Sequence, residues 1–442
     1  MARNLTRNTK VYISTQSVLG SCTNLNTWEV KVLDGYNFSQ ATTTEDITID
    51  EAGTTPIRGQ KTYNVAVEPV DISMTTYIRP YDSTTPLVDA PERILWASLA
   101  GSAYVIDGSG DMIDTTPGNG NAVLQTVTDM TVDFEESDAN ELAKLYIWFH
   151  LQNATYRVDE INISTAEIDF SITDIASIAW TGMGTAITEL SGADHTIMAG
   201  WAGGTEFRAV PATDSNSFLR NKLSTMTLYN SKLADNLTTG ADDAGTDDST
   251  VSDTGGFTGI NYVGDWVYVT ELDEFREITA NTDDALTVTP AFGSTLTIGD
   301  TYYILQGYNI AITGGTMTVE NNMNFLTPEE LGTVNQPLPG FAQSRAVTGN
   351  ITAYLNTGTR GTAQLLSDLL GDINSVSNTY GLNVAVGGSS SAKKMELQLG
   401  TAQLAIPTIN VEDVIATDIA FSGQGSADAI ENQDEIVIVY TA

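Results

Sequence analysis

The residues most able to do catalytic or metal chemistry are few in this chain of 442 residues. It has two histidines, His150 and His195, and one cysteine, Cys22. No His/Cys cluster has the spacing of a zinc site, and no G-x-S-x-G nucleophile elbow accompanies the histidines. One cysteine cannot form an intrachain disulfide, and a small semi-buried side chain is its simplest role. These residue types therefore predict neither a nucleophile nor a metal centre.

Carboxylates are abundant, yet their spacing favours turns over acid–base chemistry. Asp107, Asp111 and Asp114 lie along a Gly-rich loop. They give a hint of a calcium loop, but the closing bidentate Glu is missing, so an Asp/Gly turn is the favoured interpretation. Acidic pairs such as Glu135-Glu136 lie in predicted loops without aromatic sugar platforms. We predict that the protein is not an enzyme, has no catalytic residue and needs no cofactor or metal.

The overall charge is strongly negative. The chain has 19 Lys and Arg against 56 Asp and Glu, a formal net charge of −37. Proteins that grip nucleic acid need clustered basic side chains, so this balance argues against that function. It is compatible with a surface that repels phosphates or with a saline environment. No secretory signal and no run near the ~18 apolar residues of a membrane span are found. We therefore predict a soluble protein that folds in a cytoplasm, without a membrane partner.

One pattern of elements occurs twice. Residues 346–372 read as an alternating strand, a Gly-centred turn and a short helix whose leucines, from Leu365 to Leu370, share one face. Residues 64–101 repeat this order, with Pro91 near the helix start. The flanks agree as well: 28–53 matches 308–332, each with a predicted two-residue turn at Asp34-Gly35 or Gly314-Gly315, and 171–184 matches 410–425. The shared order predicts a duplication.

The fold class that follows is mainly β. We expect two tandem β-sandwich or barrel domains, each with a short flanking helix, at 1–200 and at 201–232 joined to 306–442. Residues 186–216 lack clean periodicity and are interpreted as a linker. Residues 233–305 interrupt the second domain. They begin with an acidic, Gly-rich and therefore flexible stretch, and continue as a small all-β domain of four or five strands.

Six segments together resemble a known family, the major tail tube proteins of viruses with long, non-contractile tails (the siphophage type). Within it the chain is similar to the duplicated kind, with two tube domains per chain. The segments are RNTKVYIST (7–15), ITIDEAGTTPIRGQK (47–61), TTYIRPY (75–81), ITGGTMTVENN (312–322), VTGNITAYLN (347–356) and IPTINVEDVIATDIAF (406–421).

The resemblance implies a structural role in the virion tail after assembly in the host cytoplasm. Three chains would form a pseudo-hexameric ring, and rings would stack into a tube whose negatively charged lumen conducts viral DNA without binding it specifically. Implied partners are further copies of the chain, the tape measure protein and the tail terminator and tip proteins. Loops at 40–61 and 327–340 would stack the rings. Their candidate residues are Glu45, Asp46, Asp50, Glu51, Arg58, Lys61, Glu329 and Glu330.

Two other classes are compatible with the composition. A virion decoration or fibre protein can be equally acidic and β-rich, but it would not require a tandem tube repeat. A secretion-system-like tube protein would share the fold, but it usually carries one domain per chain. The insert is not part of the resemblance, so we expect it to decorate the outside and to be dispensable for tube assembly.

Overall fold

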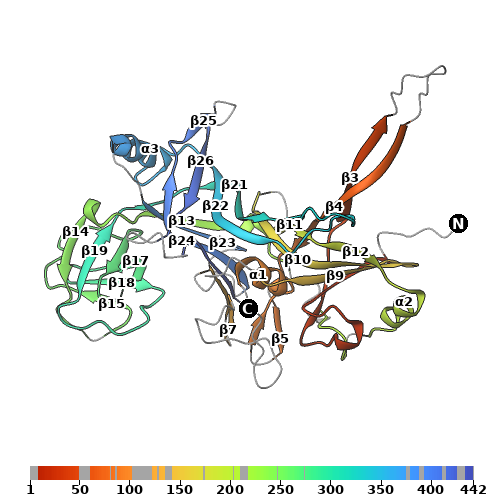
Figure 1. The fold of residues 1–442 in the computed structure, drawn as a ribbon. Coiled ribbons are helices and arrows are strands. Elements are labelled where there is room, and N and C mark those ends of the chain that lie inside the picture. The colour runs from red at the N-terminus through yellow and green to blue at the C-terminus, as the bar shows by residue number, and fades with distance from the viewer. Residues whose placement is uncertain are drawn as a thin grey trace, which may run out of the picture.

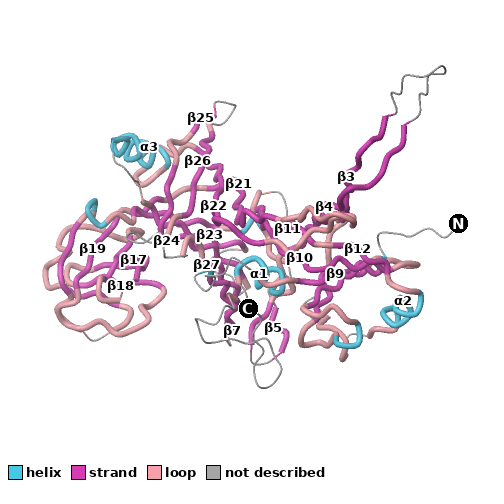
Figure 2. Tube along the Cα trace, in the orientation of Figure 1, coloured by secondary structure: helices cyan, strands magenta, loops and turns pink. Residues whose placement is uncertain are grey.

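The structure is a computed structural model. It describes residues 8–48, 60–79, 81–84, 87–101, 122–126, 129–134, 142–172, 175–202, 204–209, 218–245, 247–272, 274–374, 379–387, 393–410, 415–425 and 434–441. Strands dominate it, which confirms the predicted mainly β fold (Figures 1 and 2).

Eight antiparallel strands from both halves of the chain form one continuous main sheet. The link between the halves is a pairing of the first-half strand β10 with the second-half strand β21, in which Thr165 faces Glu320. In order across the sheet, the strands are β3 (Asn37–Thr48), β4 (Gln60–Tyr77), β11 (Ser177–Gly184), β10 (Thr155–Asp169), β21 (Ile312–Asn324), β22 (Phe341–Tyr354), β26 (Ala416–Gly423) and β24 (Lys394–Leu404).

The shorter strands repeat one arrangement in each half. Strand β9 links β1 to β10 in the first half, as β23 links β13 to β24 in the second. The first set is β1 (Lys10–Ser14), β2 (Thr27–Val30), β9 (Leu145–His150) and β12 (Ala186–Glu189); the second is β13 (Thr225–Asn230), β20 (Gly307–Tyr308), β23 (Tyr380–Val386) and β27 (Val437–Thr441). This correspondence supports the proposal of two tandem domains.

The remaining elements are short. Strands β5 (Tyr81–Thr84) and β6 (Leu87–Asp89) pair with each other, and β7 (Val123–Gln125) pairs with β8 (Asp129–Asp133). Strand β25 (Thr408–Asn410) extends the edge beyond β24 by pairing with β26. The helices are α1 (Arg93–Ala100), α2 (Gly192–Ala199) and α3 (Thr362–Gly371), and 3-10 turns occur at Leu19–Ser21, Asn221–Leu223, Leu233–Asp235 and Asp372–Asn374.

The two halves share one hydrophobic core. Every residue of α1 is buried, and the Trp96 ring meets Trp180 edge to face at 4.7 Å between centroids. The Trp96 indole N–H donates to the Tyr440 hydroxyl of β27 at 2.8 Å, and β27 also pairs with β8 of the first half. The last strand of the chain therefore anchors the first half, so the halves cannot separate without exposing this core.

The insert forms its own body. Six strands, in the order β14, β19, β16, β17, β18, β15, surround a separate hydrophobic core that includes Val267, Ile278 and Ile304. Their bounds are β14 (Thr238–Ala241), β15 (Thr250–Ser252), β16 (Trp266–Val269), β17 (Glu274–Asn281), β18 (Ala285–Thr289) and β19 (Thr301–Leu305). In Figure 1 this body lies at the end of the molecule opposite the β3–β4 hairpin.

Three local predictions were wrong. Gly314 and Gly315 do not turn the chain, because both lie within β21. The predicted linker at 186–216 contains β12 and α2. The acidic start of the insert is not the expected flexible stretch, because it contributes strands β14 and β15. Asp242 accepts backbone N–H bonds from Gly245 and Ser252 at 2.5 and 2.7 Å, and these bonds fix the turn between the two strands.

Candidate functional site: an acidic sheet face with two open edges

One face of the main sheet is turned away from the shared core and carries carboxylates. Strand β10 shows the principle: Ala166 and Ile168 are buried in the core, whereas Glu167 and Asp169 alternate with them and point to the other face. The corresponding positions on neighbouring strands supply Asp71 from β4, Glu320 from β21 and Asp418 from β26. We call these five residues, with the hydroxyl and amide side chains between them, the carboxylate face.

Cross-strand rows join the carboxylate face across both halves. One row runs Thr75, Ala179, Glu167, Thr318, Thr348, Ser422, Gln403. A second row runs Ser73, Thr181, Thr165, Glu320, Ala346. Neither row contains Lys or Arg. A surface of hydroxyls and uncompensated carboxylates repels phosphate groups and offers them no ion pair.

Two carboxylates of this face are held in place by neighbours. The Thr352 hydroxyl donates to Asp418 Oδ1 at 2.8 Å, and the Ser171 backbone N–H donates to Asp169 Oδ1 at 2.8 Å. Glu167 and Glu320 are exposed. The sequence alone did not reveal this face. Its signal was the alternation Glu167-Ile168-Asp169 between two buried positions, which is typical of a strand with one wet face.

The main sheet ends in two open edges. Among the described strands, β3 pairs with β4 alone, so its outer backbone groups face away from the protein. At the other end, described residues Gln403 to Asn410 pair with β26 alone. Exposed apolar side chains flank this second edge at Ile406 and Ile409, which are 47% and 44% exposed. Open edges with apolar neighbours are prone to pair with another chain.

The predicted ring-stacking residues of the first loop lie in a β-hairpin. Glu45 and Asp46 belong to β3, and Lys61 belongs to β4. Glu45 Oε2 accepts a bond from the Tyr63 hydroxyl at 2.7 Å. The hairpin projects well beyond the sheet (Figure 1), so residues 40–48 and 60–61 are strands and not the expected loop. Asp50, Glu51 and Arg58 lie outside the described residues.

The second predicted loop lies against the first half of the chain. Asn335 exchanges backbone hydrogen bonds with Val65 and Val67 of β4, at 3.1 and 2.9 Å. Its side chain accepts the Glu330 backbone N–H at 2.9 Å, which positions Glu329 and Glu330 near the base of the β3–β4 hairpin. The structure thus brings parts of both predicted loops together, although their role in stacking remains a proposal.

The other candidates for chemistry do not form a reactive centre. His150 and His195 meet across the Thr155 hydroxyl, which lies at the opposite end of β10 from Glu167 and Asp169. Burial raises the pKa of the Cys22 thiol, which disfavours the nucleophilic thiolate form. Asp107, Asp111 and Asp114 lie outside the described residues. In the part of the chain that the structure describes, no three His, Cys, Asp or Glu side chains are grouped to hold a metal ion.

Comparison with known proteins defines the class. A mainly β subunit with open sheet edges suits a protein that assembles edge to edge, and the comparison finds similarity to a structural protein of a phage tail tube, which supports a structural role in a virion tail. The relative is "Tail tube protein pb6" of Escherichia phage T5, to which the chain is 27% identical over 425 residues, 95% of this chain and 72% of that protein. No family model matches.

This similarity confirms the resemblance to tail tube proteins of phages with long, non-contractile tails. It spans 95% of this chain, so the matched stretch takes in both halves. Each helix among the described residues falls short, in length or apolar character, of what a membrane crossing requires.

Proposed function

We propose that three copies of this chain close into a pseudo-hexameric ring, with the two halves of each chain supplying two of the six sheet segments. The observation that carries the proposal is the pairing of β10 with β21 inside the chain. This pairing joins β10, the edge strand of the first half's part of the main sheet, to β21, the first strand of the second half's part. The same two kinds of edge are open at β24–β25 and β3, so repeating the intrachain pairing between chains would leave no edge unpaired.

The register between chains follows from the register within the chain. Segments 178–182 (IAWTG) and 419–423 (IAFSG) match, which equates Thr181 with Ser422 and hence their partners Thr165 and Gln403. The same equivalence can be followed from β11 through β4 to β3, and from β26 through β22 to β21. It shows that Ser39 occupies the position in the first half that Glu320 occupies in the second. Because Thr165 faces Glu320 within the chain, Gln403 should face Ser39 of the next chain.

The local hydrogen bonds indicate whether Gln403 and Ser39 would form a hydrogen-bonded or a non-hydrogen-bonded antiparallel pair. The Phe170 N–H donates to the Gly315 carbonyl at 3.1 Å, so by alternation Thr165 and Glu320 form a non-hydrogen-bonded pair. Just beyond the end of β24, the Ala405 N–H donates inward to the Ala420 carbonyl at 2.8 Å, which gives Gln403, two residues earlier, the same orientation. Such pairs have Cα atoms about 4.5 Å apart, within reach of a disulfide.

The carboxylate face gives the ring its function. Closing the main sheet through these edges would turn that face toward the bore, since the shared core lies on its opposite side. Viral DNA would pass a wall of hydroxyls and carboxylates that repels its phosphates and binds no base, so it would not adhere during ejection. The β3–β4 hairpin and the 327–340 loop would join successive rings. The tape measure, terminator and tip proteins remain partners by family resemblance.

A double cysteine variant tests the ring. Ser39→Cys with Gln403→Cys, in a Cys22→Ala background, should form disulfides between neighbouring chains on oxidation of assembled protein. Because each chain has both positions, denaturing gels should show a ladder that ends at the trimer. Ser39→Cys with Gln398→Cys is the matched control, because Gln398 already pairs with strands on both sides.

Two results would overturn the proposal. Assembled tubes that resist crosslinking in the Ser39/Gln403 variant, but remain intact, would show that these edges do not meet. A ladder that continues beyond three chains would show that the edges pair but that the ring is not trimeric.

A further inference from the structure

Helices α1 and α3 occupy corresponding places in the two halves, but they differ in how far they are covered. Residues 91–101 (PERILWASLAG) align with residues 361–371 (GTAQLLSDLLG), so Ala100 corresponds to Leu370. Every residue of α1 is buried, including Ala100. Leu370 is 48% exposed, and Ile373, just beyond the end of α3, is 61% exposed. The outer face of α3 is therefore an exposed apolar surface.

Helix α1 is buried because the second half of the chain lies against it. The Trp96 indole N–H donates to the Tyr440 hydroxyl of β27 at 2.8 Å. The Asn321 side-chain amide of β21 donates to the Leu99 carbonyl of α1 at 2.6 Å. Both contacts come from the second half, so α1 lies at the junction between the halves. The corresponding junction of α3 is with the next chain, if chains join as the halves do.

The open edge beside α3 shows the same difference in exposure. Gln403 corresponds to Thr165, so Ile406, three residues further on, corresponds to Ile168. Ile168 is fully buried at the pairing of β10 with β21, whereas Ile406 is exposed. Two separate elements of the second half, a helix and a strand edge, are thus exposed at positions that are buried in the first half.

The surface that would cover α3 is exposed in a matching way at the other end of the main sheet. By the register derived above, Phe38 and Gln40 of β3 correspond to Val319 and Asn321 of β21. Val319 and Asn321 are buried at the junction with the first half, whereas Phe38 and Gln40 are only half-buried. The Phe38 ring stacks on the Phe149 ring at 4.4 Å between centroids, which fixes its position.

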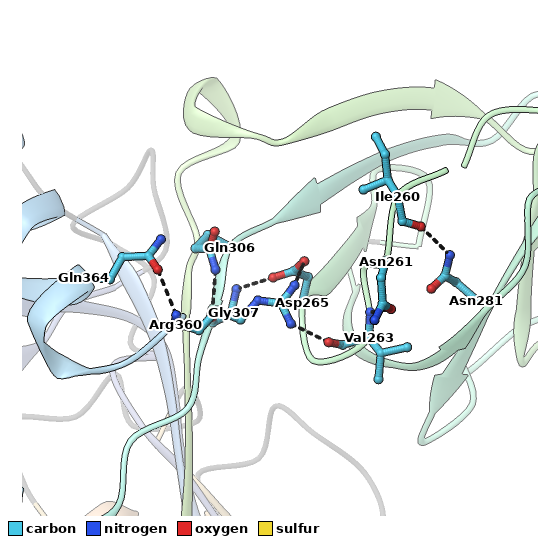
Figure 3. A network of polar contacts seen from close by, with 9 residues as sticks. All are labelled: Ile260, Asn261, Val263, Asp265, Asn281, Gln306, Gly307, Arg360 and Gln364. Carbon is cyan, nitrogen blue, oxygen red and sulfur yellow. Dashed lines mark hydrogen bonds and ion pairs between the residues drawn. The ribbon is translucent and has the colours of Figure 1, made fainter. Parts of the chain in front are cut away.

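Helix α3 is held firmly on its own chain, so its outer face has a fixed position. The Arg360 guanidinium, just before α3, forms an ion pair with buried Asp265 of the insert (Figure 3). The Arg360 N–H donates to Gln364 Oε1 at 2.8 Å, which ties this anchor to the first turn of α3. The Tyr308 hydroxyl donates to Asp368 Oδ2 at 2.8 Å, so the second half also holds α3 without the insert.

We propose that the outer face of α3 packs on the half-buried surface at residues 36–40 of the next chain. This contact rests on the proposed ring, because it carries the junction between the halves over to neighbouring chains. It would add a helix contact to the strand pairing of each interface. Leu370 and Ile373 would become buried against Phe38, and burial of such side chains favours association.

The contact between chains would be more apolar than its counterpart within the chain. The Gln40 side-chain amide already donates to the Glu68 and Thr185 carbonyls, at 2.9 and 3.1 Å. It is therefore not free to repeat the bond that Asn321 makes to α1. The larger Leu370 side chain, in place of Ala100, supplies apolar contact instead.

The first test is the assembly of full-length variants, followed by sedimentation. Leu370→Asp and Ile373→Asp should each raise the concentration needed for assembly by at least about tenfold, because a carboxylate would be buried without a partner. Leu370→Met keeps the apolar contact and should assemble as the unmodified chain does. Ile260→Asp, at an exposed position on the insert, is the matched control and should also assemble normally. Circular dichroism checks that each variant folds.

The second test locates the surface that α3 contacts. A photoreactive benzoylphenylalanine at position 370, or at position 373, should crosslink neighbouring chains in assembled protein. Mass spectrometry should place the crosslink within residues 36–40 of the partner. The same photoreactive group at position 260 of the insert should not reach those residues. The Ser39/Gln403 disulfide is measured in parallel, so that the strand pairing and the helix contact are scored separately.

The outcomes separate this contact from the ring itself. Normal assembly of Leu370→Asp and Ile373→Asp, with no crosslink to residues 36–40, would overturn the α3 contact. If the Ser39/Gln403 disulfide still forms in that case, the ring stands without it. A crosslink to residues 36–40 without the disulfide would support the α3 contact and reject the strand pairing. A crosslink that maps to another part of the neighbouring chain would also overturn the proposal.

Discussion

The imidazole rings of His150 and His195 stack at 4.7 Å between centroids, and Nδ1 of each lies 2.8 Å from the Thr155 hydroxyl. A hydroxyl has one proton, so it can donate to only one of the two nitrogens, and the other must donate to it. The arrangement therefore suits two neutral rings with different tautomers. It joins α2, which carries His195, to the end of β9.

This relationship predicts a loss of stability in mild acid. Burial, with help from His195 and Lys10, lowers the pKa of His150 from 6.5 to about 4. Between these values the unfolded chain binds the proton that the folded chain excludes, so stability is complete above pH 6.5 and falls as the pH is lowered toward 4. We expect a loss of about 2 kcal/mol in urea unfolding between pH 7 and pH 4.5.

The variant His150→Gln should flatten this part of the stability profile while lowering stability at pH 7. Its control is Glu189→Gln, which should leave the profile unchanged. A His150→Gln protein with the same acid-dependent loss between pH 6.5 and 4.5 would contradict this role for the histidine pair.

A second prediction concerns the ion pair that fixes the insert. Burial raises the pKa of Asp265 to about 6, against the opposing effects of the Gly307 N–H and Arg360. Because the folded pKa lies above the unfolded value, Asp265 costs stability as the pH rises through 6, and Arg360 limits that cost. Arg360→Gln should therefore destabilise the protein by about 3 kcal/mol at pH 8 and by less at pH 5, measured by urea unfolding.

The matched control for this pair is Lys232→Gln. Lys232 and Asp235 are 2.8 Å apart but partly exposed, so breaking this pair should cost less than about 1 kcal/mol. Equal losses in the two variants, or a loss for Arg360→Gln that does not depend on pH, would show that the Asp265 contact is not the one that holds the insert.

A third prediction places a charge at the open edge. Ile406 is 47% exposed beside β24, at the position where the next chain would pair. Ile406→Asp should leave the single chain folded but should prevent ring closure, because the carboxylate would be buried without a partner. Sedimentation would then show monomers. Ile298→Asp, on the insert and 72% exposed, should assemble normally. Normal tubes from Ile406→Asp would exclude this edge from the interface.

A fourth prediction concerns the insert as a whole. The Asn230 N–H donates to the Gln306 carbonyl at 2.9 Å, so deleting residues 233–305 leaves Ser231 and Lys232 as a two-residue hairpin turn. With these two changed to Asn-Gly and Tyr229→Thr to remove the uncovered ring, the shortened chain should still form tubes visible by electron microscopy. A folded chain that no longer polymerises would show that the insert is part of the tube wall.

The sequence predicted those elements whose signal is local. The alternation of 346–355 and the leucines of 362–371 gave β22 and α3, although only Leu365 and Leu369 of those leucines are buried. The Asp34-Gly35 turn also appears, with Gly35 at φ 102°. In each case the residues that specify the element lie within a few positions of one another.

The features that the sequence missed depend on distant contacts. Gly315 is required by packing and not by a turn, since a Cβ there would lie 2.4 Å from the Asn350 carbonyl and 2.5 Å from the Phe170 ring. Residues 186–202 are structured because Met198 and Trp201 meet Tyr12 and Trp148 from other parts of the chain. The carboxylate face likewise exists only after eight strands align, so spacing along the chain could not reveal which acidic residues share it.

A reconstruction of the assembled tube by electron microscopy tests the central proposal most directly. The account predicts three chains per ring, with β3 of each chain paired to the β24–β25 edge of the next, Ser39 opposite Gln403, and Glu167 and Glu320 facing the bore. Six chains per ring, or a main sheet whose carboxylate face points outward, would contradict it.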